Sequence, residues 1–234
     1  ASVLFLDQVR AAGTEDHPIQ IYGSTPQEWG GIFLVGRQTA GSVLKNIIIR
    51  KGSGAVIDNV TYTGMMMLVD TKDVVIEKIS FFDNKVYDDA LRVVYSEKIE
   101  LRDLVFEGSK SDAIDLDLSS AMIFGVKIKD SGNDGIDLMG STVFADSISI
   151  SGSGDKGFSI GEESIIEIYN SEVRDSKIGI ESKDGSFALV VDTKLVSNEI
   201  QVNAYKKNWR YHTGGRAKLT RVEMTSSENR LSTD

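Results

Sequence analysis

The chain of 234 residues contains no cysteine and only two histidines, His17 and His212. The absence of cysteine excludes disulfides, thiolate zinc sites and thiol nucleophiles, and two histidines cannot build a multi-histidine metal centre. Proline is equally rare, with 2 residues against 22 glycines, which does not fit a collagen-like or proline-rich segment. No apolar run approaches the roughly 20 residues that a membrane-spanning helix needs.

Acidic residues outnumber basic ones, 35 against 26, and the formal net charge is -9. A nucleic-acid-binding domain usually carries a basic surface, so this balance argues against DNA or RNA as a partner. The charge is also uneven along the chain: acids dominate residues 103–199, whereas residues 200–234 are basic. We therefore expect an acidic body with a basic carboxyl-terminal end.

A short motif recurs along the chain at a nearly constant interval. Residues 112–116 read Asp-Ala-Ile-Asp-Leu, and related strings occupy residues 134–138, 156–160, 178–182 and 200–204, each 22 residues further on. An earlier copy at residues 89–93 lies 23 residues upstream of the first string. Internal repeats of this length indicate a solenoid, in which each unit packs on the next.

Apolar and polar positions alternate within the motif. One apolar column contains Leu91, Ile114, Ile136, Phe158, Ile180 and Val202. The column after it is polar and contains Arg92, Asp115, Asp137, Ser159, Glu181 and Asn203. This period-two alternation is typical of a strand with one buried face. The position directly before the apolar column is alanine or glycine in five copies. This indicates a tight bend, where a larger side chain would collide with the turn.

Each unit contains two further strand-like segments. We place the second through Ile99/Leu101, Met122/Phe124, Val143/Ala145, Ile166/Ile168 and Leu189/Val191, and the third near Val105, Val126/Ile128, Ile148/Ile150, Val173 and Leu195. Three short strands in 22 residues leave no room for a helix, and propeller blades need longer repeats. The sequence therefore predicts an all-β fold, a single-stranded parallel β-helix with about 22-residue coils.

We expect one domain in three parts. Residues 1–40 form irregular amino-terminal coils, residues 41–204 form the regular coils, and residues 205–234 form a terminal loop or cap and a polar tail. Because a solenoid exposes unpaired strand edges at its ends, we also expect the amino-terminal coil to contact another copy or a larger chain.

The strings at residues 133–138 and 154–157 resemble the repeat units of right-handed parallel β-helix proteins, the pectate-lyase-like superfamily. The resemblance covers roughly residues 41–205 and is closest in style to secreted bacterial β-helix domains of undefined activity. It implies right-handed coils, a secreted or cell-surface location and a polysaccharide or cell-surface glycan as partner. The superfamily includes lyases, hydrolases, epimerases and scaffolds, so the resemblance alone does not choose an activity.

Aspartates on neighbouring coils share columns. Asp115 and Asp137 share the polar column, and Asp112 and Asp134 share another. Carboxylates about 5 Å apart repel by about 3 kcal/mol at an effective dielectric near 20. In a groove, such a ladder requires compensation by a raised pKa, a nearby lysine or a bound Ca²⁺.

Lys156 continues the column of Asp89, Asp112 and Asp134, and Lys177 continues the neighbouring column of Asp88, Ser111, Asn133 and Asp155. The resemblance implies that the four aspartates hold Ca²⁺ and that one of the two lysines abstracts the proton beside a uronate carboxylate, as in calcium-dependent polysaccharide lyases. A glycosidase with paired carboxylates is a weaker alternative. The favoured alternative is structural, because Asp and Asn at coil corners commonly bond to the adjacent backbone.

Residues 205–212 break the repeat and mix aromatic with basic residues. Five of them are candidate glycan contacts, through stacking on sugar rings and pairing with anionic groups: Tyr205, Lys206, Lys207, Trp209 and Arg210. The favoured alternative is a loop that covers the last coil, with Trp209 packed inward.

These patterns predict a scaffold or polysaccharide-binding module. The alternative is a Ca²⁺-dependent polysaccharide lyase acting on uronate-containing glycans, and a further alternative is a self-assembling structural protein.

Overall fold

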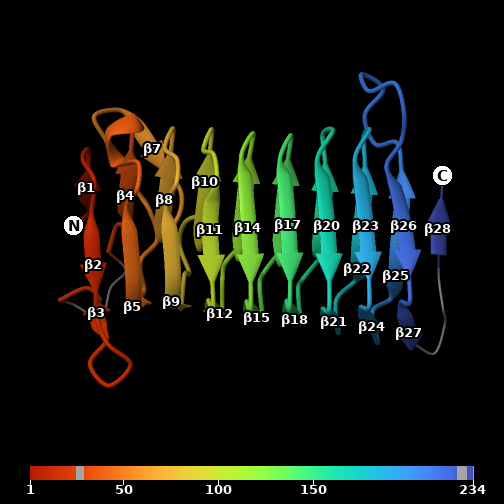
Figure 1. Ribbon diagram of the computed structural model, residues 1–234, viewed down its shortest axis with the longest axis horizontal. Helices are drawn as coiled ribbons and strands as arrows, with labels where there is room; N and C mark the ends of the chain where they lie inside the picture. The colour runs from red at the N-terminus through yellow and green to blue at the C-terminus, as the bar shows by residue number, and fades with distance from the viewer. Residues whose placement is uncertain (25–28, 226–230, 234) are drawn as a thin grey trace.

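The structure is a computed structural model that describes residues 1–24, 29–225 and 231–233. The chain winds into coils stacked along one long axis, with the amino end on the left and the carboxyl end on the right of Figure 1. Within the described residues every element is a β-strand except one short 3-10 helix, Arg37–Thr39. All named strand pairs are parallel except β6 with β7.

One side of the solenoid is a ten-stranded sheet. Its strands, in spatial order, are β1 (Val3–Phe5), β4 (Ile32–Val35), β8 (Met66–Val69), β10 (Leu91–Val94), β13 (Ile114–Asp117), β16 (Ile136–Met139), β19 (Lys156–Gly161), β22 (Ile178–Lys183), β25 (Ile200–Tyr205) and β28 (Leu231–Thr233). Each coil contributes one strand, so the sheet runs the length of the molecule.

The other two sides belong to one bent sheet. The first of these two sides contains β2 (Arg10–Ala12), β11 (Ile99–Arg102), β14 (Ser120–Phe124), β17 (Thr142–Asp146), β20 (Ile165–Tyr169), β23 (Phe187–Val191) and β26 (Arg216–Thr220). The second contains β3 (Ile19–Ile21), β12 (Val105–Glu107), β15 (Lys127–Lys129), β18 (Ser149–Ser151), β21 (Glu172–Arg174), β24 (Lys194–Val196) and β27 (Glu223–Thr225). The long strands β5 (Val43–Arg50) and β9 (Val75–Phe82) pass through the bend between them. A hairpin of β6 (Ala55–Ile57) and β7 (Val60–Tyr62) completes the fold.

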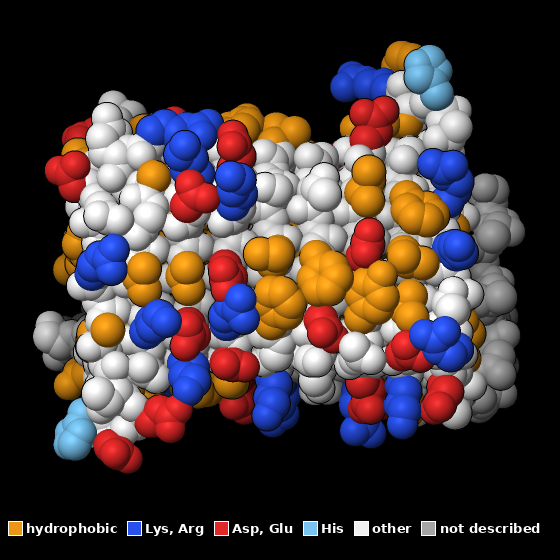
Figure 2. Space-filling view, in the orientation of Figure 1, with side chains coloured by type: hydrophobic (Ala, Val, Ile, Leu, Met, Phe, Trp, Pro, Cys, Tyr) orange, Lys and Arg blue, Asp and Glu red, His pale blue; other side chains and the backbone are white. Residues whose placement is uncertain are grey.

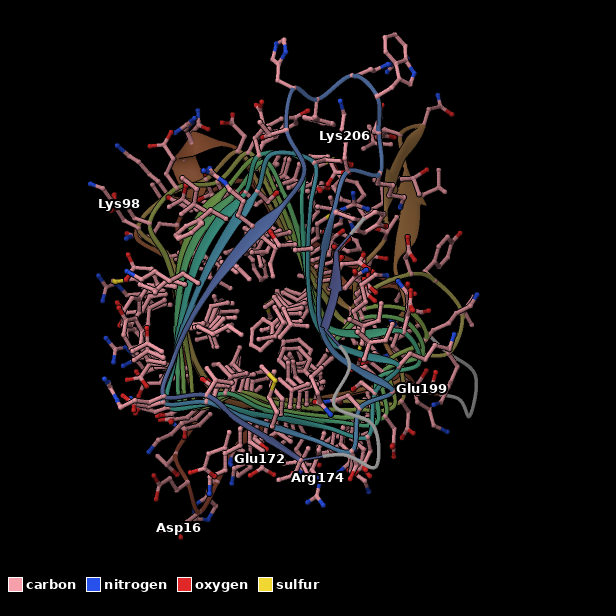
Figure 3. All side chains as sticks on the ribbon, turned by 90° about the vertical axis from the view of Figure 1, so that its right-hand side faces the viewer. Asp16, Lys98, Glu172, Arg174, Glu199 and Lys206 are labelled. Carbon is pink, nitrogen blue, oxygen red and sulfur yellow. The ribbon has the colours of Figure 1, made fainter. Side chains whose placement is uncertain are left out.

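The predicted winding is confirmed by the strand register. Ile114 pairs with Leu91 below it and with Ile136 above it, and the column continues through Phe158 to Ile180. All of these side chains are buried, and Figure 3 shows that side chains fill the interior of the coil. The stacked apolar columns therefore form the core, as in other solenoids.

The small residues of the bend face inward. A Cβ atom on Gly157 would lie 2.2 Å from Cγ1 of Val173 and 2.6 Å from the carbonyl oxygen of Gly179. Glycine is therefore required at this position because any larger residue would collide with Val173 across the coil and with the next coil, as predicted.

In two coils the core-facing positions predicted for the second strand are wrong by one residue. In β14 it is Ala121 and Ile123 that face the core, whereas Met122 is 46% exposed and lies outside with Phe124. The same slip affects Leu189 in β23. Because side chains alternate along a strand, a shift of one residue exchanges the two faces. Figure 2 shows the resulting band of hydrophobic side chains over β14, β17, β20 and β23.

The coils continue past residue 204, where the sequence predicted a cap. After a loop, β26 pairs with β23 and β27 pairs with β24. Strand β28 then pairs with β25. The predicted boundary is therefore too early, because the loop interrupts the repeat spacing without ending the stack. Within the expected polar tail, residues 226–230 and 234 lie outside the described residues.

A ladder of buried hydroxyl groups lines one corner of the solenoid. The Oγ atoms of Ser119, Ser141, Ser164 and Ser186 each accept a hydrogen bond from the backbone N–H of the equivalent residue one coil earlier, at 3.0–3.1 Å. Backbone groups at the corner cannot all pair within the sheets, so the serines supply the missing acceptors.

Candidate functional site

The ten-stranded sheet carries a row of ionisable side chains on its outer side. We call this surface the acidic face and define it by Asp89, Arg92, Asp112, Asp115, Asp117, Asp134, Asp137, Asp155, Lys156, Ser159, Glu181, Lys183, Asp184 and Asn203. Alternation along β10, β13, β16, β19 and β22 directs the members of the face that lie on these strands away from the apolar core. Asp89, Asp112, Asp134 and Asp155 lie one or two residues before the strands, and Asp184 directly follows β22. Asp115 pairs in register with Asp137, as predicted.

Arg92 on β10 gathers three aspartates around its guanidinium. Its Nη2 lies 2.5 Å from Oδ2 of Asp117, its Nε lies 3.3 Å from Oδ2 of Asp115, and its Nη1 lies 3.9 Å from Oδ2 of Asp89. Nη1 also donates to Oγ1 of Thr63 at 3.1 Å. One cation therefore serves three carboxyl groups, although the exposed fractions of Asp89, Asp115 and Asp117 are only 1%, 8% and 6%.

Asp112 and Asp134 link successive coils through the backbone. Oδ1 of Asp112 accepts from the N–H of Asp134 at 2.7 Å and from Nδ2 of Asn133 at 2.9 Å. Oδ1 of Asp134 accepts from the N–H of Lys156 at 2.9 Å. This is the structural role that the sequence favoured for aspartates at coil corners.

Burial shifts the pKa of the carboxyl groups around Arg92 upward. Burial, followed by the charges of Asp115 and Asp112, raises the pKa of Asp89 to about 9. Burial and the charge of Asp117 raise the pKa of Asp115 to about 8, although Arg92 opposes the shift. Taking a carboxylate out of water disfavours its charged form, so these groups are largely protonated at neutral pH.

The next two carboxyl groups shift in the same direction by smaller amounts. Burial raises the pKa of Asp112 to about 7. Burial raises the pKa of Asp134 to about 6, and the smaller rise reflects the opposing charge of Lys156. Shifted carboxyl groups gathered at one surface are typical of functional sites, because acid–base chemistry and ligand binding require them there.

The two lysines that the sequence singled out occupy different environments. The ammonium of Lys156 bonds to the carboxylate of Asp155 and lies 3.6 Å from Oδ1 of Asp134. Burial alone would lower the pKa of Lys156, but its bond to Asp155 and the charge of Asp134 outweigh burial and raise it. Lys156 is therefore held as a cation, which disfavours the predicted role of base. Lys177 lies in the bend before β22 and is exposed.

A second ionic group lies further along the acidic face. Lys183 on β22 donates from Nζ to Oγ of Ser159 at 2.8 Å, and the same Nζ lies 4.0 Å from Oε1 of Glu181. Oε2 of Glu181 accepts from Nδ2 of Asn203 at 3.0 Å. The ionisable row thus continues toward the carboxyl end of the solenoid.

The four aspartates predicted to hold Ca²⁺ do not fit the ion. Among the residues that the structure describes, no three acidic or histidine side chains are arranged to hold a metal. Oδ1 atoms of Asp112 and Asp134 are occupied by backbone donors of the next coil, and Asp115 faces Arg92. Ca²⁺ needs six to eight converging oxygen ligands, which this arrangement does not supply.

The candidate glycan contacts lie at the edge of the acidic face. Tyr205 ends β25 and pairs in register with Lys183. Oδ1 of Asp184 accepts from the N–H groups of Lys207 and Asn208, both at 2.7 Å, and so anchors the loop. The loop projects beyond the coil near the labelled Lys206 in Figure 3.

Trp209 on this loop is 83% exposed, so its predicted inward packing is wrong. The guanidinium carbon of Arg210 lies 6.0 Å from the centre of the Trp209 ring. Lys206, Lys207 and Arg210 are exposed as well. The loop therefore presents an aromatic ring and three cations to solvent, which suits a ligand contact better than a cap.

Sequence reasoning missed several members of the site. Asp89 and Arg92 were placed in columns but assigned no role, and Asp117 was not considered. The sequence signal for Asp117 is a charged residue three positions after the apolar column of Ile114 and Ile180. Asp117 on β13 and Lys183 on β22 both occupy that position. Charges that compensate one another diagonally between columns do not align in a single column, so comparison of columns overlooks them.

Comparisons with known proteins agree with this architecture. A family model described as right handed beta helix region matches residues 72–209, more than half of the chain, so the protein belongs to this family. The alginate lyase from Paenibacillus sp. str. FPU-7 superposes with a TM-score of 0.64 at 13% identity, covering 100% of this chain and 91% of the lyase.

The periplasmic alginate epimerase AlgG superposes with a TM-score of 0.58 at 12% identity, covering 85% of this chain and 48% of the epimerase. At these identities the two likenesses establish the fold alone, a right-handed parallel β-helix. A search of the curated proteins gives no match. Within the described residues, no helix is both long and apolar enough to cross a membrane.

Proposed function

We propose that the protein is a secreted or cell-surface β-helix that binds a polysaccharide along the acidic face and the adjoining loop. The observation that carries the proposal is the row of buried and half-buried, outward-facing ionisable groups from Arg92 to Lys183. Keeping charged groups away from water is costly. Such groups are typical of a surface where a ligand replaces water.

The loop adds the contacts that sugar rings favour. Trp209 presents an exposed ring, and Tyr205 lies in register beside Lys183 on the neighbouring strand. Amphipathic aromatic side chains contribute large contact areas at binding surfaces. The solved alginate lyase and alginate epimerase are named for a polysaccharide, and their shared fold makes such a ligand a reasonable choice for this chain.

Binding to a panel of immobilised acidic, basic and neutral polysaccharides tests the proposal. We expect at least one class to retain the protein, and the Trp209→Ala variant to elute earlier with an unchanged melting temperature. Tyr22→Ala, which removes an aromatic side chain that is 65% exposed elsewhere, is the matched control. Failure of every polysaccharide to retain the wild-type protein would reject the proposal.

Polysaccharide cleavage is a second candidate, and one observation favours it. Asp115 holds a proton at neutral pH one coil away from Asp137, and a protonated carboxyl group beside a second carboxyl group can act as a general acid. A lyase reaction through Lys156 would need that amine to be neutral, against the influence of Asp155 and Asp134.

Incubation with uronate polymers, with and without Ca²⁺, separates these chemistries. A rise in ultraviolet absorbance from unsaturated sugars indicates a lyase, whereas new reducing ends without that rise indicate hydrolysis. The hydrolysis product should be lost in Asp115→Asn, and the lyase product should be lost in Lys156→Ala. The absence of any product with the panel of polysaccharides leaves binding as the function.

A further inference from the structure

The acidic face carries far more carboxyl groups than cations. Its acids are Asp89, Asp112, Asp115, Asp117, Asp134, Asp137, Asp155, Glu181 and Asp184, and its bases are Arg92, Lys156 and Lys183. Even with several carboxyl groups protonated, the surface is negative. A surface of one sign attracts ligands of the opposite sign and repels those of its own.

The three cations are already engaged by the protein. Arg92 pairs with Asp117 and Asp115, and Lys156 pairs with Asp155 and Asp134. Lys183 donates to Ser159 and lies near Glu181. A sugar carboxylate would have to displace these partners and would add negative charge to the surface. The face is therefore poorly suited to a uronate polymer.

Several buried acceptor atoms on this face lack a hydrogen-bond donor, which favours a ligand that carries donors. Oε1 of Glu181, Oδ2 of Asp184 and Oδ1 of Asn203 have no hydrogen-bond partner among the described residues. The two oxygens of Asp89, which share a proton at neutral pH, and the donor Nε of Arg92 have none either. Asp89 is 1% exposed, Glu181 3% and Asp184 0%. Buried acceptors without donors are rare in folded proteins, and an ammonium group supplies three donors and no acceptor.

We propose that the acidic face selects a polysaccharide with free amino groups, a polymer of amino sugars. The inference rests on the proposed function that this face binds a polysaccharide, and it names the class of sugar. Asp115 and Asp137 are strand neighbours, and Glu181 follows in the same column after Ser159, so carboxyl groups recur at multiples of about 4.8 Å along the axis. A polymer with regularly spaced ammonium groups can therefore contact successive coils.

The basic loop does not oppose this choice. Lys206 lies on the loop that projects from the edge of the face in the upper part of Figure 3, whereas Asp115 and Asp137 lie on β13 and β16 of the sheet. The exposed ring of Trp209 is itself suited to a cation, because the face of an indole attracts positive charge.

Calorimetric titration at pH 6 with three oligosaccharides of equal length tests the inference. The probes are a glucosamine oligomer with free amines, the same oligomer fully N-acetylated, and a mannuronate oligomer. We expect the free-amine oligomer to bind at least about tenfold more tightly than either of the others, and added salt to weaken it. Asp137→Asn should reduce that preference about tenfold. Asp155→Asn, closer to the edge, serves if the first variant does not fold.

Glu172→Gln removes a carboxylate from a different side of the coil, labelled in Figure 3, and should leave the preference unchanged. Tighter binding of the N-acetylated or the mannuronate oligomer would overturn the inference while leaving the proposed function intact. Binding of none of the three, nor of any polysaccharide in the panel, would reject both.

Discussion

Arg92 Nη2 donates to Oδ2 of Asp117 at 2.5 Å, across the boundary between two coils and between two columns. Asp117 pairs in register with Val94, two residues beyond Arg92 on β10, so the contact is diagonal. The diagonal leaves Asp115, the direct strand partner of Arg92, 3.3 Å from Nε of the same guanidinium. A single arginine at the start of the acidic face thus stabilises two successive outward positions of the next strand.

Replacing Arg92 by methionine should destabilise the protein strongly. The change leaves Asp115 and Asp117 buried without a cation, and breaking a buried ion pair by removing one partner costs about 3–5 kcal/mol. The loss should be smaller at pH 5 than at pH 8, because burial raises the pKa of Asp115 to about 8 and this carboxyl group is protonated at pH 5. Urea unfolding at the two pH values measures both.

Arg174→Met provides the comparison. Arg174 pairs with Glu172 and Asp175 on an exposed surface, where such pairs contribute about 0–1 kcal/mol. Equal losses of unfolding free energy in the two variants would mean that the carboxyl groups beside Arg92 are solvated.

Stability should fall as the pH rises from 6 to 9. Asp134, Asp112, Asp115 and Asp89 have folded-state pKa values of about 6, 7, 8 and 9. An unfolded aspartate titrates near pH 3.9, so in this range the folded state binds more protons. Their contribution is complete below about pH 4 and is lost as the pH passes each folded-state pKa, with slopes up to about 1.4 kcal/mol per pH unit per group.

Asp89→Asn tests the assignment of this effect to the acidic face. Asparagine keeps the shape of the side chain and has no charge to bury, so the variant should be more stable than the wild type at pH 9 and should show a flatter decline. Melting temperatures at pH 6, 7.5 and 9 measure the difference. A melting temperature of the wild type that rises over this range would contradict the shifts.

Prediction from sequence succeeded where a structural rule acts on one column at a time. The column of Ile114 and Ile136 gave the winding period directly, because stacked coils place equivalent residues in contact. It failed for Met122, where the apolar run of β14 does not alternate and the face cannot be read from hydrophobicity. It also failed for Trp209, because an exposed aromatic side chain in a loop has the same sequence pattern as a packed one.

The serine ladder predicts a marked cost for the loss of one hydroxyl. Ser141→Ala removes the acceptor for the N–H of Ser119, and Ser119 and Ser141 are only 6% and 1% exposed. An unsatisfied buried donor costs about 1–3 kcal/mol. Ser149→Ala, at an exposed position of β18, should change the unfolding free energy by less than about 0.5 kcal/mol. Urea unfolding of the pair measures the contrast, and similar small losses would mean that the corner is open to water.

The stacked core predicts both a large loss and a coupling between coils. Ile136 is fully buried between Ile114 and Phe158, so Ile136→Ala should cost about 2–5 kcal/mol of unfolding free energy. Ile165→Ala, which shortens a side chain that is 48% exposed on β20, should cost far less. Ile114 and Ile136 are strand neighbours. The loss of unfolding free energy in the double variant Ile114→Ala/Ile136→Ala should therefore differ from the sum of the two single losses by at least about 0.5 kcal/mol. Strict additivity of the two buried substitutions would be incompatible with their contact across successive coils.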